Sequence, residues 1–174
     1  MVITETRRLF LRHFQMADGD AMDGVFGDAE VMHYGRGVQT QQWVRDWLAE
    51  RLEDDRQERG FGLWAVVEKC SESVIGFCGL SRYPDVCGQP EVEIGYRLAR
   101  PHWGQGYGTE AARAVRDYGF NTLSLTRLIA TIDPQNVASI RVVEKIGMRY
   151  EKDVMFDGFT HPDGVYALTR SAND

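Results

Sequence analysis

A glycine-rich segment joins two stretches of different hydrophobic period and limits the possible folds more than any other part of the sequence. It runs Gly104-Gln105-Gly106-Tyr107-Gly108. Residues 91–98 before it alternate acidic and apolar side chains, which predicts a β-strand with one apolar face. Residues 109–121 after it carry apolar side chains at helical spacing. Strand, turn and helix together direct backbone N–H groups and a helix dipole toward one point, which suits a phosphate, although glycines also form turns that bind nothing.

The hydrophobic pattern of the whole chain predicts an α/β (α+β) fold. Strands are expected at residues 9–14, 63–68, 74–82, 91–98, 127–132, 150–156 and 165–169. Helices are expected at residues 16–27, 40–60, 109–121 and 137–146, with Thr40 as an N-cap and Gly147 as a left-handed C-cap. We therefore expect a single mixed, mostly antiparallel sheet of six to seven strands flanked by about four helices, in one domain over residues 1–174.

Composition excludes several classes of protein. With 174 residues, 43% of them hydrophobic and 26% charged, the chain can bury a core without disulfides. Its net charge of -6 argues against nucleic-acid binding, because phosphate neutralisation needs a basic surface. The longest uninterrupted apolar run, Leu63 to Val67, is far shorter than the roughly 20 residues that cross a bilayer, and Met1 to Phe14 has no signal-peptide core. A cytoplasmic protein, neither secreted nor membrane-bound, is the expectation.

The residues that usually bind metals or form disulfides are scattered. Cys70, Cys78 and Cys87 match neither a disulfide framework nor a Cys-x-x-Cys site. The four histidines include no i, i+4 pair. We expect no metal site.

The glycine-rich segment also departs from the common nucleotide-binding patterns. No Gly-Lys-Ser/Thr follows it, and Thr109 and Ala111 stand where the two frames of a Rossmann fingerprint require their last glycine. Asp133, at the end of the next expected strand, does resemble the ribose-binding acid of that fingerprint. Dinucleotide binding is therefore an alternative, but too few residues follow for two βαβ halves, and the first half of the chain looks antiparallel.

Four separated segments resemble the GNAT superfamily of N-acetyltransferases, of the RimJ/RimL type that acetylates ribosomal proteins. Residues 5–12, ETRRLFLR, resemble the family's entry into its first strand, and residues 93–98, EIGYRL, resemble its fourth strand. Residues 103–111, WGQGYGTEA, are similar to its pyrophosphate-binding turn. Asn136 and Ser139, followed by EKIGM at residues 144–148, are similar to its second cofactor motif. The order and spacing of these segments extend over most of the chain.

The resemblance implies the GNAT fold and acetyl-CoA as co-substrate. It implies that the pantetheine arm lies between the fourth and fifth strands and pairs with the backbone of Tyr96, Arg97 and Leu98, as an added strand would. Asn136 would hydrogen-bond this arm. The amides that would bind the diphosphate belong to Trp103, Gly104, Gln105, Gly106, Tyr107, Gly108 and Thr109. Trp103 replaces the Gln or Arg common at its position, so a side-chain contact to phosphate is lost.

Two side chains are candidates for the chemistry of acyl transfer to an amine. A primary amine near pKa 10 must lose a proton, and Glu93 is the expected general base, directly or through water. The alternative is a solvent-facing carboxylate paired with Arg97 or Arg100. Many relatives carry a tyrosine, as proton donor to the thiolate, where this chain has Val143, so Ser139 is the expected donor here. Its alternative role is to satisfy N–H groups at the start of its helix.

Two functional hypotheses follow. In the first, the chain is an acetyl-CoA-dependent N-acetyltransferase that acts on a primary amine, either a protein N-terminus or a small molecule, with His33 and Tyr34 lining the acceptor cleft. A homodimer is plausible by analogy. In the second, suggested by Trp103 and Val143, the chain is an acyl-CoA-binding or interaction module without turnover.

Overall fold

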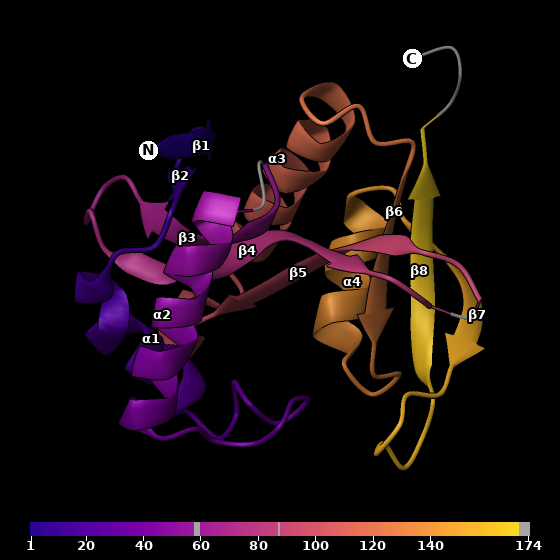
Figure 1. Cartoon of the computed structure of the whole chain (residues 1–174), viewed down its shortest axis with the longest axis horizontal. Helices are drawn as coiled ribbons and strands as arrows, with labels where there is room; N and C mark the ends of the chain where they lie inside the picture. Colours follow the sequence, from indigo (N-terminus) through magenta and orange to yellow (C-terminus); the bar gives the residue numbers. More distant parts are fainter. Residues whose placement is uncertain (58–59, 87, 171–174) are drawn as a thin grey trace.

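One eight-stranded sheet organises the molecule, in the order β1-β2-β3-β4-β5-β6-β8-β7 (Figure 1). The computed structural model describes residues 1–57, 60–86 and 88–170. The strands are β1 (Val2–Glu5), β2 (Leu9–Arg12), β3 (Gly62–Glu68), β4 (Val74–Tyr83), β5 (Glu91–Leu98), β6 (Arg127–Ile132), β7 (Arg149–Val154) and β8 (Asp163–Thr169). The α-helices are α1 (Gly19–Phe26), α2 (Gln41–Gln57), α3 (Tyr107–Asn121) and α4 (Val137–Lys145), and the short 3-10 helices are η1 (Met16–Asp18) and η2 (Arg100–His102).

The expected fold class is confirmed, with two differences. The additional strand is β1, whose four residues are too short for the alternation rule to separate from a loop. Helix α3 begins at Tyr107 instead of at Thr109, so the end of the glycine-rich turn is already the first helical turn. The expected end of α2 near Gly60 cannot be compared, because residues 58 and 59 lie outside the described residues.

The strands β5 and β6 separate from one another. They are the one parallel pair among the described strands, and their register contains a single match, Glu93 with Ile129. Beyond that match the carboxyl ends of the two strands have no common ladder, while β5 stays paired with β4 along its length. A sheet with one parallel pair cannot contain the two βαβ halves of a dinucleotide-binding fold, so that alternative is wrong.

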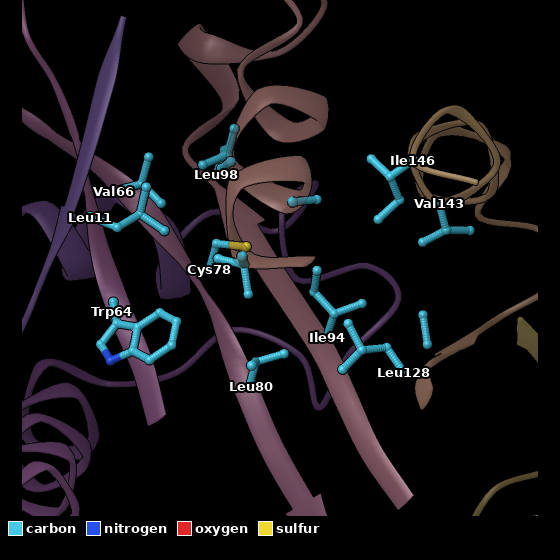
Figure 2. Packing of buried hydrophobic residues seen from close by; sticks show 14 of the residues in the cluster. Leu11, Trp64, Val66, Cys78, Leu80, Ile94, Leu98, Leu128, Val143 and Ile146 are labelled. Atoms are coloured by element: carbon cyan, nitrogen blue, oxygen red, sulfur yellow. The ribbon is translucent and has the colours of Figure 1, made fainter. Parts of the chain in front are cut away.

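The sheet buries both of its faces. Trp64, Cys78 and Ile94 belong to the cluster that packs under α3 and α4 (Figure 2). Ala65 and Phe77, each one residue along its strand, belong to the cluster under α1 and α2. Because successive side chains of a strand point to opposite faces, the near-continuous apolar sequence of β4 satisfies both clusters.

Capping residues define the helix ends as the sequence predicts. The Thr40 hydroxyl accepts a hydrogen bond from the Trp43 amide, at 3.2 Å, before α2 begins. Gly147, after α4, has φ of +97°, the left-handed conformation that glycine adopts without strain. None of the helices in the described residues combines the length and the apolar character needed to span a membrane.

Candidate functional site

A cavity of about 850 Å³ lies between the carboxyl end of β5, the glycine-rich turn and the start of α4. Of the residues expected to act in the site, it is lined by Tyr96, Arg97, Leu98, Trp103, Gly104, Gly106, Tyr107, Gly108, Thr109, Asn136 and Ser139. Gln105 and Glu93 do not line it. The cavity therefore joins three segments that the sequence could connect only by analogy.

The turn presents a series of free backbone donors to this cavity. Gly104 and Gly106 have φ of +73° and +82°, a region that side chains other than glycine adopt only with strain. Within the described part of the chain, the amides from Gly104 to Thr109 have no hydrogen-bond acceptor, and the next amide, that of Glu110, bonds to the Gly106 carbonyl. Free amides at the amino end of a 15-residue helix form an anion site.

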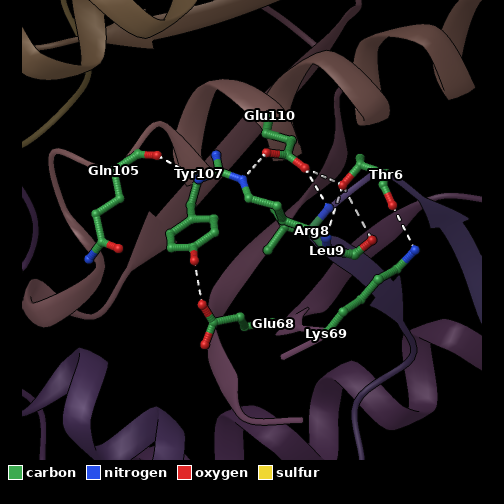
Figure 3. A network of polar contacts seen from close by, with 8 residues as sticks. All are labelled: Thr6, Arg8, Leu9, Glu68, Lys69, Gln105, Tyr107 and Glu110. Atoms are coloured by element: carbon green, nitrogen blue, oxygen red, sulfur yellow. Dashed lines mark hydrogen bonds and ion pairs between the residues drawn. The ribbon is translucent and has the colours of Figure 1, made fainter. Parts of the chain in front are cut away.

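An arginine from the segment between β1 and β2 holds the back of the turn (Figure 3). The Arg8 guanidinium donates to the Gln105 carbonyl at 2.9 Å and to the Glu110 carboxylate at 2.7 Å. It also lies over the Tyr107 ring, with its central carbon 4.3 Å from the ring centroid. By bonding to the Gln105 carbonyl, Arg8 keeps that oxygen away from the amides, where it would repel a phosphate.

The carboxylate of Glu110, in the first turn of α3, is the ion-pair partner of Arg8. Besides Arg8, it accepts hydrogen bonds from the Thr6 hydroxyl at 2.5 Å and from the Arg8 amide at 3.0 Å. Burial alone would raise the pKa of Glu110, but the hydrogen bonds from Thr6 and Arg8 outweigh it and lower that pKa. Glu110 thus stays charged and ties the first turn of α3 to the amino-terminal segment.

The start of α4 brings one hydroxyl, that of Ser139, to the cavity. The Asn136 side-chain oxygen accepts a hydrogen bond from the Ser139 amide at 3.1 Å, so Asn136 caps the helix. No helix amide in the described residues donates to the Ser139 hydroxyl, so it does not serve as the cap. Burial raises the pKa of Tyr96, and a hydrogen bond from the Ser139 side chain offsets part of that rise. Nearby, the Tyr96 hydroxyl donates to the Ser139 carbonyl at 3.0 Å and bridges β5 to α4. Val143 is fully buried in the core.

The two turn residues with long side chains do not point at a ligand. The Trp103 indole nitrogen donates to the Leu98 carbonyl at 2.7 Å, which fixes the ring against the end of β5. The Gln105 side-chain amide donates to the Pro101 carbonyl at 2.8 Å. Both residues would therefore contribute to phosphate binding through the backbone.

Glu93 lies on the opposite face of β5 from the side chains of Tyr96 and Leu98. Its carboxylate accepts hydrogen bonds from the Thr131 amide at 3.0 Å and from the Thr131 hydroxyl. Burial raises its pKa, and the hydrogen bonds from Thr131 and Tyr83 offset part of that rise. The charge of Glu93, together with burial, raises the pKa of Tyr83 to about 12. The alternative of a solvent-facing carboxylate paired with Arg97 or Arg100 is wrong.

A loop over residues 28–40 covers the other end of the cavity. His33 and Tyr34 line the cavity, as expected, and the Tyr34 hydroxyl donates to the Gln135 carbonyl at 3.1 Å. An ion pair of 2.8 Å joins Glu30 to Arg100. The loop is thereby fastened on both sides of the cavity.

Neither of the two described cysteines, Cys70 and Cys78, lines the cavity. Cys78 is buried in the core, and burial raises the pKa of its thiol, so it is not a nucleophile. Cys70 is exposed, and Cys87 lies outside the described residues.

The residues around the cavity fit coenzyme A. The free amides of the turn match a diphosphate, and the unpaired edge at the end of β5 matches the amides of a pantetheine arm. Arg8 and Glu110 were missed as supporting residues by sequence reasoning. The one available signal was an acidic residue in the first turn of α3, and opposite charges 102 positions apart cannot be paired from spacing.

Comparison with known proteins connects this geometry to a family. The model of the acetyltransferase (GNAT) domain matches residues 8–149. Protein YkkB of Bacillus subtilis (strain 168), described as uncharacterized, is 41% identical over 152 residues, and the match covers 86% of each chain. The spermidine N(1)-acetyltransferase of Escherichia coli (strain K12) is 30% identical over 150 residues, which cover 86% of this chain and 77% of that protein.

Solved structures of acetyltransferases have the same fold as this chain. An acetyltransferase of the GNAT family from Bacillus anthracis superposes with a TM-score of 0.83 at 30% identity, covering 97% of this chain and 98% of that chain. RimL, a ribosomal L7/L12 alpha-N-protein acetyltransferase in complex with coenzyme A, superposes with a TM-score of 0.76 over 97% and 98% of the two chains. At 17% identity, the second likeness concerns the fold alone.

Proposed function

The chain belongs to the GNAT acetyltransferase family and is an N-acetyltransferase, and from that premise we propose that it passes an acetyl group from acetyl-CoA directly to a primary amine. The observation that carries the proposal is the row of free amides from Gly104 to Thr109 at the mouth of the 850 Å³ cavity. The first N–H groups of a helix have no partner inside it, and here they follow a turn with two left-handed glycines and open on a cavity, where an anion can serve as their acceptor.

Acetyl-CoA would supply the acetyl group as a thioester. The amides of the turn would hold its diphosphate, with Arg8 and Glu110 fixing their direction. The backbone of Tyr96, Arg97 and Leu98 would pair with the pantetheine arm, and the free amide nitrogen of Asn136 would add a donor.

Glu93 and Ser139 would move the protons. Glu93 would take a proton from the ammonium group of the acceptor, directly or through a water, because its raised pKa makes it a stronger base. The neutral amine would then attack the thioester carbonyl, forming the C–N bond as the C–S bond breaks. The Ser139 hydroxyl would donate a hydrogen bond to the sulfur as it leaves. A thiolate is a tolerable leaving group, so this second role is the smaller one.

Two classes of acceptor are supported by relatives. The E. coli relative is named for spermidine, a small amine, and RimL for the amino terminus of a ribosomal protein. A RimJ/RimL-type activity on a protein N-terminus and an activity on a small amine both agree with the primary-amine chemistry proposed here.

The test is CoA release, followed with a thiol reagent, when the protein is incubated with acetyl-CoA and spermidine, single amino acids or N-terminal peptides. The proposal predicts release above the hydrolysis rate with at least one acceptor, in step with acetylated product. Acetyl-CoA binding without release from any acceptor would instead indicate an acyl-CoA-binding module.

A glycine substitution tests the cofactor site separately. Gly106→Val should lower the affinity for acetyl-CoA by more than tenfold, because the side chain strains the turn and approaches Arg8 at 3.4 Å. Gly158→Val is the matched control, since Gly158 has a similar φ of +85° and open space around it, in the turn between β7 and β8. An equal loss of affinity for acetyl-CoA in both variants would mean that backbone strain at a glycine, and not the position of Gly106 in the turn, causes the loss.

A further inference from the structure

Arg97 is a cation without an anion. It lies on β5 and lines the cavity, and within the described ranges it forms no ion pair. One guanidinium nitrogen approaches the Met32 sulfur at 2.8 Å. A Cβ at Gly35 would lie 2.9 Å from the other, so a loop residue with a side chain could not cover it. Half-buried charges are normally paired, and this one has only a thioether and a loop backbone beside it.

The surroundings of Arg97 place it on the acceptor side of the sheet. Arg97 is paired in register with Phe77, and both Phe77 and Met32 belong to the cluster under α1 and α2. By the two-residue period of a strand, Glu93 lies on the same face. Arg97 is thus on the face that carries the proposed general base, below the loop that bears His33 and Tyr34.

The strand surface between Arg97 and Glu93 is bare. Gly95 separates them, and a Cβ there would meet only a Leu63 methyl at 3.9 Å. The two Cα atoms are about 13 Å apart along an extended strand, whose side chains on one face stand roughly perpendicular to the sheet. The Glu93 carboxylate is bonded to Thr131 and the Arg97 guanidinium lies beside Met32 and Gly35, so no side chain of β5 stands between the acidic and the basic residue.

We infer that Arg97 binds a carboxylate of the acceptor, and that the acceptor is a small amino acid whose amine lies toward Glu93. This inference rests on the proposed acetyltransferase function and narrows it. A polyamine would place a second cation near Arg97, and a peptide N-terminus has a neutral amide where an amino acid has its carboxylate. Guanidinium and carboxylate form two parallel hydrogen bonds, which a lone ammonium cannot replace.

The test compares each amino acid with its own carboxamide in the CoA-release assay, with spermidine and N-terminal peptides included. In the unmodified protein, at least one amino acid should have a kcat/KM about 10- to 100-fold above its carboxamide, the range expected for one charge-assisted contact. Arg97→Gln should reduce that ratio to about 1, and Arg97→Lys should restore only part of it. The ratio is read within one enzyme, so an effect on cofactor binding cancels.

Arg100→Gln is the control variant, because it removes a neighbouring charge that is already paired with Glu30. It should leave the ratio unchanged, and a ratio that falls equally in both variants would indicate a general electrostatic effect and overturn the inference. Turnover of carboxamides, peptides or spermidine at rates equal to or above those of amino acids would overturn it while the acetyltransferase function stands. Absence of turnover with every acceptor would overturn both.

Discussion

At the scale of single residues, the site depends on groups whose protonation or charge is set by their surroundings. Glu93 is the clearest case, since burial raises its pKa while Thr131 and Tyr83 hydrogen-bond its charged form. A carboxylate with a raised pKa accepts a proton more readily than a solvated one, and the hydrogen bonds to its charged form limit the rise.

This environment gives a pH prediction for Glu93. A base acts in its deprotonated form, so activity is lost as pH falls through its pKa, and a raised pKa moves that loss upward. The acidic limb of kcat/KM should therefore lie above the ordinary glutamate value of about 4.3. Glu93→Gln should remove the limb and lower kcat at neutral pH by about 10²- to 10⁴-fold, with partial recovery at higher pH as the amine deprotonates itself.

Glu91→Gln is the control for that measurement. Glu91 lies two residues earlier on the same strand face, buried and ion-paired with Arg127 at 3.0 Å. Its loss should lower stability and leave the acidic limb in place. An unchanged profile in the Glu93 variant would remove Glu93 as the base.

At the scale of elements, the amino-terminal segment supports a turn about 100 positions away. Figure 3 shows Arg8 between the Gln105 carbonyl and Glu110, with the Tyr107 hydroxyl bonded to Glu68 on β3. The turn itself has little internal bonding, because its amides are free. Its conformation must therefore be held from outside, by β1, β2 and β3.

Arg8→Ala tests this support. It should raise the KM for acetyl-CoA roughly tenfold, the cost of one charge-assisted hydrogen bond, with kcat within about twofold, because the reacting atoms lie elsewhere. Arg8→Lys should recover only part of the affinity, since one ammonium cannot bond to Gln105 and Glu110 in the guanidinium geometry. The adjacent Arg7→Ala is the control and should behave as the unmodified protein, since Arg7 is exposed. A kcat that falls with unchanged KM in Arg8→Ala would contradict a supporting role.

Several elements could be predicted from the sequence because their signals are local. The bounds of β5 and β6 follow from alternation and from the Asp133-Pro134 stop, and both agree with the structure. The Thr40 cap and the Gly147 conformation follow from single residue types. The glycine-rich turn is likewise contained in one contiguous segment.

Contacts between distant segments could not be predicted. The order of the strands in the sheet decides which distant residues meet. It brings Arg8 to Glu110 and Thr131 to Glu93, and it leaves Arg97 without an ion-pair partner in the described residues. Charge and spacing along one chain do not encode that order. For the same reason, neither the general-base prediction nor its solvent-facing alternative anticipated that Glu93 is buried and hydrogen-bonded to Thr131.

At the scale of the whole molecule, the sheet separates two tasks. Its α3 and α4 side carries the glycine-rich turn, its α1 and α2 side carries Glu93 and Arg97, and the cavity extends from the turn to the loop over residues 28–40. Beyond their single register match, the carboxyl ends of β5 and β6 have no common ladder. Under the proposed function, the acyl donor and the amine would meet near this point, which favours direct transfer over a covalent enzyme intermediate.

The central claim is that the free amides from Gly104 to Thr109 bind the diphosphate of coenzyme A. A crystal structure of the protein grown with coenzyme A measures this directly. The account predicts diphosphate oxygens about 2.7–3.2 Å from several of these amide nitrogens, with the Gln105 carbonyl still bonded to Arg8. Coenzyme A bound elsewhere, or a turn whose amides face the protein interior, would contradict it.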